Sequence, residues 1–272
     1  MKILVSIDIE GVAGVMHPEQ TRGGCSEYER ARAWMTDEAN AAIRGALTGG
    51  ATQVLVNDAH GSFHNLLLER IDERARVITG KPRTLGMMAG VEQGCDAVCM
   101  IGYHASAQTA GVLAHTINSF AFRRVRVNGR EMGEAGLYGA LAGEFGAPVA
   151  LLSGDDVFLA ETLPLFPGAI GVETKCAQGY AACASLTPTR ACREIQQAAQ
   201  TAMSRIPDLR PFTITGPLEC ELTAQTPGLA DLFSQLPGLE RMSVCALRFR
   251  ADTMQSIVRV LNTLSAMSFM LR

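Results

Sequence analysis

The chain repeats a pattern of short, continuously apolar segments that each end in polar or charged residues. Such segments occupy positions 3–7, 53–57, 97–101 and 148–152, and helical patterns separate several of them. Strands that are apolar throughout, rather than alternating in polarity, are typical of a parallel sheet covered on both faces. The pattern therefore predicts an α/β fold with a mainly parallel central sheet flanked by helices.

Helix-start and turn signals separate the expected elements of this first part. Ser26 and Glu29 have the spacing of a capping box, which predicts a helix that begins there and extends to about Leu47. A further strand is expected at 122–127. It is followed by the turn signal Asn-Gly and by a helix over about 133–145.

Beyond about residue 180 the pattern changes without an obvious linker. The elements expected there are a helix at 187–205, strands at 211–221 and 242–249, and an amphipathic helix at 252–269. Few residues suited to catalysis lie in this part. We therefore expect a catalytic α/β metal-binding domain over 1–180 and a smaller C-terminal α/β lobe over 181–272, which supports the first or builds an oligomer.

The composition narrows the possible partners. Of the 272 residues, 47% are hydrophobic and 19% are charged, which suits a buried parallel sheet or a large subunit interface, so we expect a homo-oligomer. The net charge of -3, without a lysine or arginine run, gives no electrostatic signal for nucleic acid or an anionic membrane. No glycine-rich nucleotide-binding motif occurs, which disfavours a nucleotide-binding module.

The sequence also gives an expected compartment and an expected role for the cysteines. No apolar run approaches the length of a membrane span, and Met1 leads directly into a strand pattern without a cleavage site, so we expect a cytoplasmic protein. The eight cysteines include no C-x-x-C pair, and we expect most to be buried thiols. Cys95 and Cys99 have a ligand-like spacing, but Cys99 lies within an expected strand, so we expect no zinc role for them.

Polar residues follow three of the expected strands. Asp8 and Glu10 share one face of the chain and repel each other unless a metal or protons neutralise them. His60 and His104 follow two other strands, and the carboxyl ends of parallel strands meet at one crevice. Alternatively, one acid caps a turn while the other is solvated, and each histidine is a polar core residue. Together the four indicate a catalytic transition-metal site, with zinc foremost and manganese or cobalt as alternatives.

A third carboxylate suggests more than one metal ion. Glu134 begins an expected helix, although Glu131 competes with it for this role. Three carboxylates and two histidines exceed what one tetrahedral catalytic zinc normally takes from a protein, so a pair of ions fits better. Such binuclear sites hydrolyse amides or phosphate esters.

Five short segments carry a resemblance to a known family. In order and spacing they resemble the DppA-type D-aminopeptidases, a family of zinc metallopeptidases. These segments are 6–11, 56–60, 102–105, 114–115 and 133–136. The resemblance covers essentially the whole chain. It implies a binuclear zinc site in which Asp8 bridges two ions, Glu10 and His60 complete one side, and His104 and Glu134 complete the other.

The resemblance also implies that His115 is a catalytic residue outside the metal shell. From the residues alone, His115 could return to the crevice and relay a proton, because the pKa of imidazole lies near neutrality, or it could make a structural hydrogen bond. Family members act on short peptides with N-terminal D-amino acids and form decamers of two stacked rings. The same substrates and assembly are therefore implied for this chain.

The expected function is a metal-dependent aminopeptidase. It would hydrolyse short peptides, with D-amino acids at the N-terminus, through a hydroxide activated on two zinc ions per subunit. We expect a free carboxylate near the metals to pair with the substrate ammonium. The alternative is a binuclear hydrolase of another substrate class, such as phosphoesters. The lack of a lysine or arginine cluster beside the motifs disfavours it.

Overall fold

A seven-stranded sheet forms the centre of the larger lobe in the computed structural model, which describes residues 1–272. In spatial order its strands are β3 (Ala75–Ile78), β2 (Gln53–Asp58), β1 (Lys2–Ile7), β4 (Ala97–Ile101), β7 (Val149–Asp155), β8 (Ile170–Gly179) and β9 (Ala182–Ser185). All neighbouring strands run parallel except β8 and β9, which pair antiparallel. The mainly parallel central sheet is confirmed.

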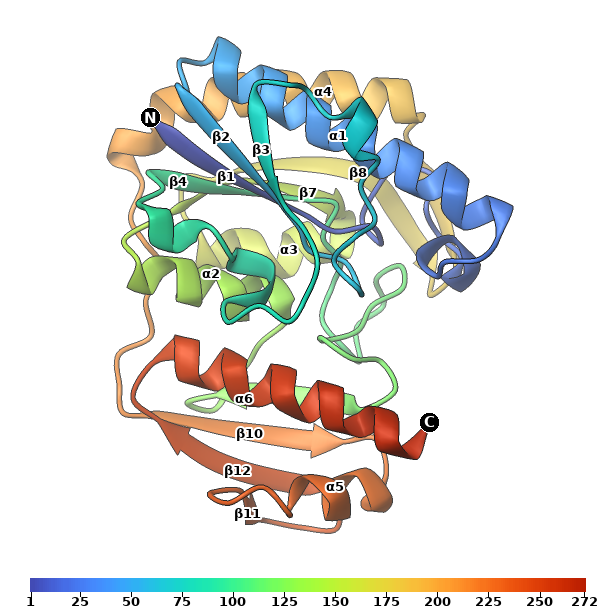
Figure 1. Ribbon diagram of the computed structural model, residues 1–272, viewed down its shortest axis with the longest axis vertical. Helices are drawn as coiled ribbons and strands as arrows, with labels where there is room; N and C mark the ends of the chain where they lie inside the picture. The colour runs from blue at the N-terminus through green and yellow to red at the C-terminus, as the bar shows by residue number, and fades with distance from the viewer.

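Helices cover both faces of this sheet (Figure 1). Figure 1 shows α1 (Ser26–Thr48) and α4 (Pro188–Arg205) side by side above the sheet, with α2 (Glu134–Glu144) and α3 (Asp156–Thr162) below it. The helices α1 and α4 approach closely, since a Cβ atom at Gly45 would lie 2.2 Å from the carbonyl oxygen of Gln196. Small residues at this crossing therefore fix the distance between the two helices.

The smaller lobe is an antiparallel sheet with two helices. Its strands, in spatial order, are β11 (Glu240–Arg241), β12 (Ala246–Ala251), β10 (Leu218–Ala224), β5 (Phe122–Val127) and β6 (Arg130–Glu131). The helices are α5 (Pro227–Phe233) and α6 (Met254–Met267). In Figure 1, α6 lies between the two sheets, and it contacts α2 of the larger lobe.

The lobes do not follow the expected division of the chain at residue 180. The strand β9 completes the larger sheet and α4 packs on α1, although both come after residue 180. In the other direction, β5 and β6 come before it but belong to the smaller sheet, where β5 pairs with β10 and β6 pairs with β5. Pairing between strands that lie far apart in the sequence decides this arrangement. The local pattern of apolar and polar residues does not predict such pairing.

Several local expectations also differ from the structure. The capping box does not form: α1 begins at Ser26, and Cys25 occupies the N-cap without a side-chain hydrogen bond. The strand expected at 211–221 begins only at Leu218. Of the eight cysteines, only three are buried, so most are not buried thiols. None of the helices combines the length and apolar character that a membrane crossing requires.

Candidate metal centre

Three neighbouring strands of the larger sheet end at the same place. Asp8 directly follows β1, His60 comes two residues after β2, and His104 comes three residues after β4. The ends of β1 and β4 approach closely, because a Cβ atom at Gly102 would lie 2.4 Å from the Asp8 carbonyl oxygen. Gly102 also has a φ of +66°, which side chains disfavour. Glycine at this position therefore allows the strand ends to converge.

The structure brings the five expected ligands together. Glu10 enters from the loop after β1, and Glu134 is the first residue of α2. His60 Nδ1 lies 3.1 Å from Asp8 Oδ1 and 3.1 Å from Glu10 Oε2. His104 Nε2 lies 3.5 Å from Asp8 Oδ2 and 3.4 Å from Glu134 Oε1. The two oxygens of Asp8 thus face two different histidines.

Backbone carbonyls orient both imidazoles. His60 Nε2 donates to the carbonyl oxygen of Thr21 at 2.8 Å, and His104 Nδ1 donates to that of Ala105 at 3.0 Å. A carbonyl oxygen only accepts, so these nitrogens carry the hydrogens. The other nitrogen of each ring faces the carboxylates, as in metal-binding histidines.

Without a cation, the buried cluster attracts protons. Burial, and then the charge of Glu10, raise the pKa of Asp8 to about 7. Burial alone would lower the pKa of His104, but the neighbouring Glu134 outweighs it and raises that pKa to about 10. In the same way, Glu10 and Asp8 outweigh burial and raise the pKa of His60. The histidines therefore carry positive charge where a metal ion would otherwise supply it.

Two buried atoms of the cluster lack a hydrogen-bond partner. These atoms are Glu10 Oε2 and His104 Nε2. Buried polar atoms in native proteins almost always have a hydrogen-bond partner, so the lack of one at these two atoms indicates that they bind a ligand. A carboxylate oxygen and an imidazole nitrogen are both ligand atoms for zinc. The donor set therefore fits a divalent metal ion.

His115 lies at the edge of this cluster. Its ring stacks on that of His104, with centroids 4.1 Å apart, and its Nε2 lies 3.7 Å from Glu134 Oε1. Its Nδ1 donates to the carbonyl oxygen of Leu113 at 2.9 Å, so Nε2 has a free lone pair. Burial, and then the charge of His104, lower the pKa of His115. A neutral imidazole here could accept a proton, or could bind a metal together with His104 and Glu134.

A buried aspartate positions the loop that carries His115. Asp155, at the end of β7, accepts from the backbone N–H of Val112 at 2.7 Å and from that of Phe158, in the first turn of α3, at 2.7 Å. It therefore caps α3, and it also ties the 112–115 segment to the end of the sheet. His115 reaches the cluster from this anchored loop.

Two other acidic residues, Glu131 and Asp58, do not take part in the cluster. Glu131 pairs with Arg124 at 3.1 Å on the smaller sheet, so Glu134 is the glutamate that faces the cluster. Asp58 contacts no histidine. Its carboxylate accepts from the backbone N–H groups of Asn65 and Leu66, which makes it a loop anchor and not a histidine partner.

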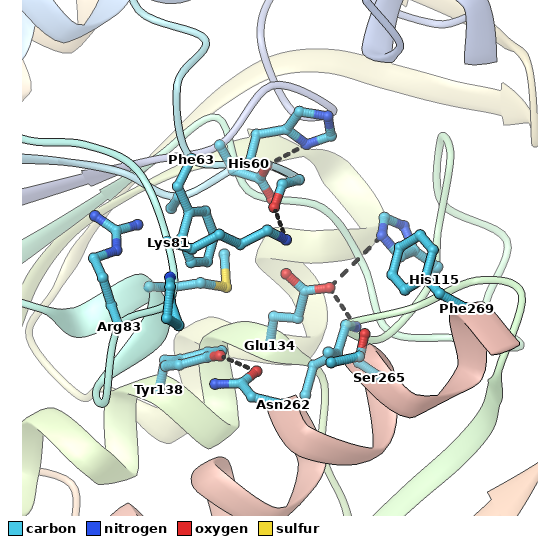
Figure 2. Close-up of a pocket in the computed structure, with 17 residues that line it drawn as sticks. His60, Phe63, Lys81, Arg83, His115, Glu134, Tyr138, Asn262, Ser265 and Phe269 are labelled. Atoms are coloured by element: carbon cyan, nitrogen blue, oxygen red, sulfur yellow. Dashed lines mark hydrogen bonds and ion pairs between the residues drawn. The ribbon is translucent and has the colours of Figure 1, made fainter. Parts of the chain in front are cut away.

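A cavity of about 470 Å³ lies between the cluster and the smaller lobe (Figure 2). Asp8 and Glu134 are the only carboxylates that line it, so the free carboxylate expected for the substrate ammonium is absent from this cavity. Its other lining side chains include Phe63, Lys81, Met87, Tyr138, Asn262 and Phe269.

The sequence interpretation missed these cavity residues. Tyr138 could have been found, because it comes four residues after Glu134 and so shares a helix face with it. Its hydroxyl donates to Asn262 Oδ1 at 3.2 Å. Asn262 had no sequence signal, because α6 belongs to the other lobe.

Known proteins resemble this chain over nearly its whole length. Residues 1–263 match a family model described as D-aminopeptidase. A curated D-aminopeptidase of Bacillus subtilis (strain 168) is 31% identical over 255 residues, which is 93% of each chain. Among solved structures, the Zn-dependent D-aminopeptidase DppA from Bacillus subtilis, a self-compartmentalizing protease, superposes with a TM-score of 0.95. It is 28% identical, and the match covers 99% of this chain and 98% of that one. The chain therefore belongs to the D-aminopeptidase family.

Proposed function

We propose that this chain is a zinc-dependent aminopeptidase that removes N-terminal D-amino acids from short peptides. Family membership supports the aminopeptidase activity, and the zinc dependence of the Bacillus subtilis structure supports the metal. The observation that carries the proposal is the Asp8 carboxylate, whose two oxygens face His60 and His104 separately. This arrangement suits a bridge between two cations.

The proposal includes two zinc ions per subunit, and the geometry of the five ligands supports it. Asp8, Glu10 and His60 would hold one ion, and Asp8, His104 and Glu134 would hold the other. Zinc bound there would act as a Lewis acid on the scissile carbonyl and would lower the pKa of water to about 7. The protein supplies buried, oriented ligands and excludes bulk water from them.

His115 would move protons in this reaction. Its Nε2 is unprotonated and lies beside the proposed ligand Glu134. Because its pKa is lowered, His115 is neutral near pH 7 and could take a proton from the attacking water and give it to the leaving amine. The cavity beside it, lined by Phe63, Met87 and Tyr138, would hold a substrate side chain.

The assembly is also a proposal. We expect a homo-oligomer, and a decamer of two stacked rings is the specific form that we propose. The overall similarity to the self-compartmentalizing Bacillus subtilis protease supports an oligomer that encloses its sites. A closed assembly would restrict the sites to short, flexible peptides.

A substrate panel tests the activity. Zinc-loaded protein is incubated with D-alanyl and L-alanyl dipeptides, the N-acetylated D-dipeptide and a phosphodiester. We expect hydrolysis of the D-alanyl peptide, slower hydrolysis of the L-peptide, and none of the other two. Equal cleavage of the N-acetylated peptide would refute an aminopeptidase, and cleavage of the phosphodiester alone would indicate a different hydrolase.

A further inference from the structure

Lys81 reaches across the cavity toward the metal centre. Its Nζ donates to the carbonyl oxygen of Gly61 at 2.7 Å, and Gly61 directly follows His60. Figure 2 shows the side chain passing Phe63 and ending in the space between His60 and Glu134. The ammonium is therefore held next to a proposed metal ligand, although Lys81 itself lies in the loop after β3.

A strained turn holds this lysine in position. Phe63 has a φ of +63°, a conformation that bulky residues rarely adopt and that often marks a functional site. Its carbonyl oxygen accepts from Thr79 Oγ1 at 2.7 Å, which ties the turn to the segment before Lys81. Its ring then lies 5.2 Å from Lys81 Nζ. The turn supplies both a surface and a carbonyl oxygen to the ammonium.

The neighbouring cation has a different, structural role. Arg83 lies 4.0 Å from the Phe63 ring centroid. Its guanidinium donates to the carbonyl oxygens of Asp58 at 2.6 Å and Ile78 at 3.0 Å. These bonds tie β2 to the segment after β3, and they direct Arg83 toward the backbone. Lys81 is therefore the cation that remains available to a ligand.

Lys81 has no anionic partner in the protein. It forms no ion pair, and its one hydrogen bond uses only one of the three donors of an ammonium. Burial and the nearby Arg83 both lower its pKa, and no carboxylate opposes them. If two divalent ions were bound, their positive charge would exceed the negative charge of the three carboxylates Asp8, Glu10 and Glu134 by one. The occupied site would then attract an anion.

We propose that Lys81 binds the C-terminal carboxylate of a peptide whose N-terminal amide lies at the metal centre. The inference rests on the proposed function and makes its substrate class specific: very short peptides with a free C-terminus. Lys81 lines the same cavity as Asp8 and Glu134. Because an extended chain advances about 3.3–3.6 Å per residue, a di- or tripeptide is the length that would place its carboxylate in this cavity while the scissile bond lies at the metals. Amidated and longer peptides would lose the ion pair.

The test compares two peptides that differ only at the C-terminus. Zinc-loaded wild-type protein, Lys81→Met and Lys81→Arg are assayed on D-alanyl-D-alanine and its C-terminal amide. We expect the wild type to prefer the free acid by about tenfold or more in kcat/KM, mainly through KM. Lys81→Met should lose this preference, because its kcat/KM should fall by about tenfold on the free acid and by much less on the amide. Lys81→Arg should keep part of the preference, because it keeps the charge.

A matched control separates this role from a general loss of charge. Lys2 Nζ also donates to a backbone carbonyl oxygen, that of Gln93 at 2.7 Å, but at the opposite end of β1. Lys2→Met should therefore leave the preference unchanged. Zinc content and the thermal midpoint of Lys81→Met show that the variant is folded.

Three outcomes would overturn the assignment in different ways. Equal rates of the wild type on both peptides would exclude any carboxylate receptor. A preference that persists in Lys81→Met would assign the receptor to another cation, such as Arg22 or Arg272, which line an adjacent groove that also contains Lys81. If zinc-loaded protein cleaves neither peptide, the proposed function itself fails, and this inference fails with it.

Discussion

At the scale of single residues, the centre depends on how Asp8 divides its two oxygens between His60 and His104. The spacing of Asp8 and Glu10, and the positions of the two histidines after apolar segments, predicted this convergence, because parallel strands end at one edge. Lys81 could not be predicted in the same way. The position of the Lys81 side chain depends on the turn at Phe63, and no sequence pattern predicts the positive φ of this residue.

The first prediction at this scale concerns His115. Replacing it with alanine should leave the zinc content unchanged and lower kcat by about 10²- to 10⁴-fold, because a proton relay is lost and no proposed ligand is removed. Elemental analysis and steady-state kinetics on the same preparation give both quantities. A loss of zinc in this variant would instead assign His115 to the metal shell with His104 and Glu134.

The second prediction follows from the raised pKa values of His60 and His104. Both histidines hold protons near neutral pH in the metal-free protein, and zinc must displace them. Zinc binding should therefore release protons, and the affinity should fall as the pH falls from 8 to 6. Titration calorimetry in two buffers with different ionisation enthalpies measures this release. Equal heats in both buffers would contradict it.

At the scale of elements, a buried lysine shapes the loop between β1 and α1. Lys175, in β8, donates through Nζ to the carbonyl oxygens of Glu10 at 2.6 Å, Val12 at 2.8 Å and Val15 at 2.5 Å. The adjacent Thr174 donates to that of Gly11 at 2.6 Å. Strand β8 thus fixes the loop that carries a proposed metal ligand. Lys175 gave no sequence signal, because its role depends on pairing with β7.

Lys175→Met should therefore affect both stability and one metal. Three buried carbonyl oxygens would lose their donor, so we expect a loss of roughly 3 kcal/mol in the free energy of unfolding. Zinc on the Glu10 side should dissociate more readily than zinc on the Glu134 side, which competition with a chromophoric chelator resolves. Leu222→Ala, in the core of the smaller sheet, is a control of similar cost that should leave both affinities unchanged. Equal weakening of both ions by Lys175→Met would argue against a local effect.

At the scale of the whole molecule, the cavity exists because the two lobes meet. The larger lobe supplies the metal centre. In the smaller lobe, α6 supplies Asn262 and Ser265, and the turn that follows α6 supplies Phe269. The alternation of strands and helices predicted the parallel sheet. It could not show that β5 and β6 belong to the other lobe, because β5 pairs there with β10, which comes much later in the chain.

The assembly gives a prediction at the same scale. Large apolar side chains are exposed at Val244 (68%) and Met270 (75%), which suits burial between subunits. Light scattering coupled to size-exclusion chromatography should give a mass of ten subunits, and Val244→Asp together with Met270→Asp should lower it. A monomeric mass for the unaltered protein would contradict the proposed decamer.

The most direct test of the whole account is the zinc content of the protein purified and dialysed against a low concentration of zinc. We predict about two zinc ions per subunit, and fewer than one in Asp8→Ala, because both sides of the centre share this carboxylate. Asp58→Asn, which alters a nearby buried aspartate that contacts no histidine, should retain two. A content of one zinc or none in the unaltered protein, or an Asp8→Ala variant that keeps both ions, would contradict the bridged binuclear centre.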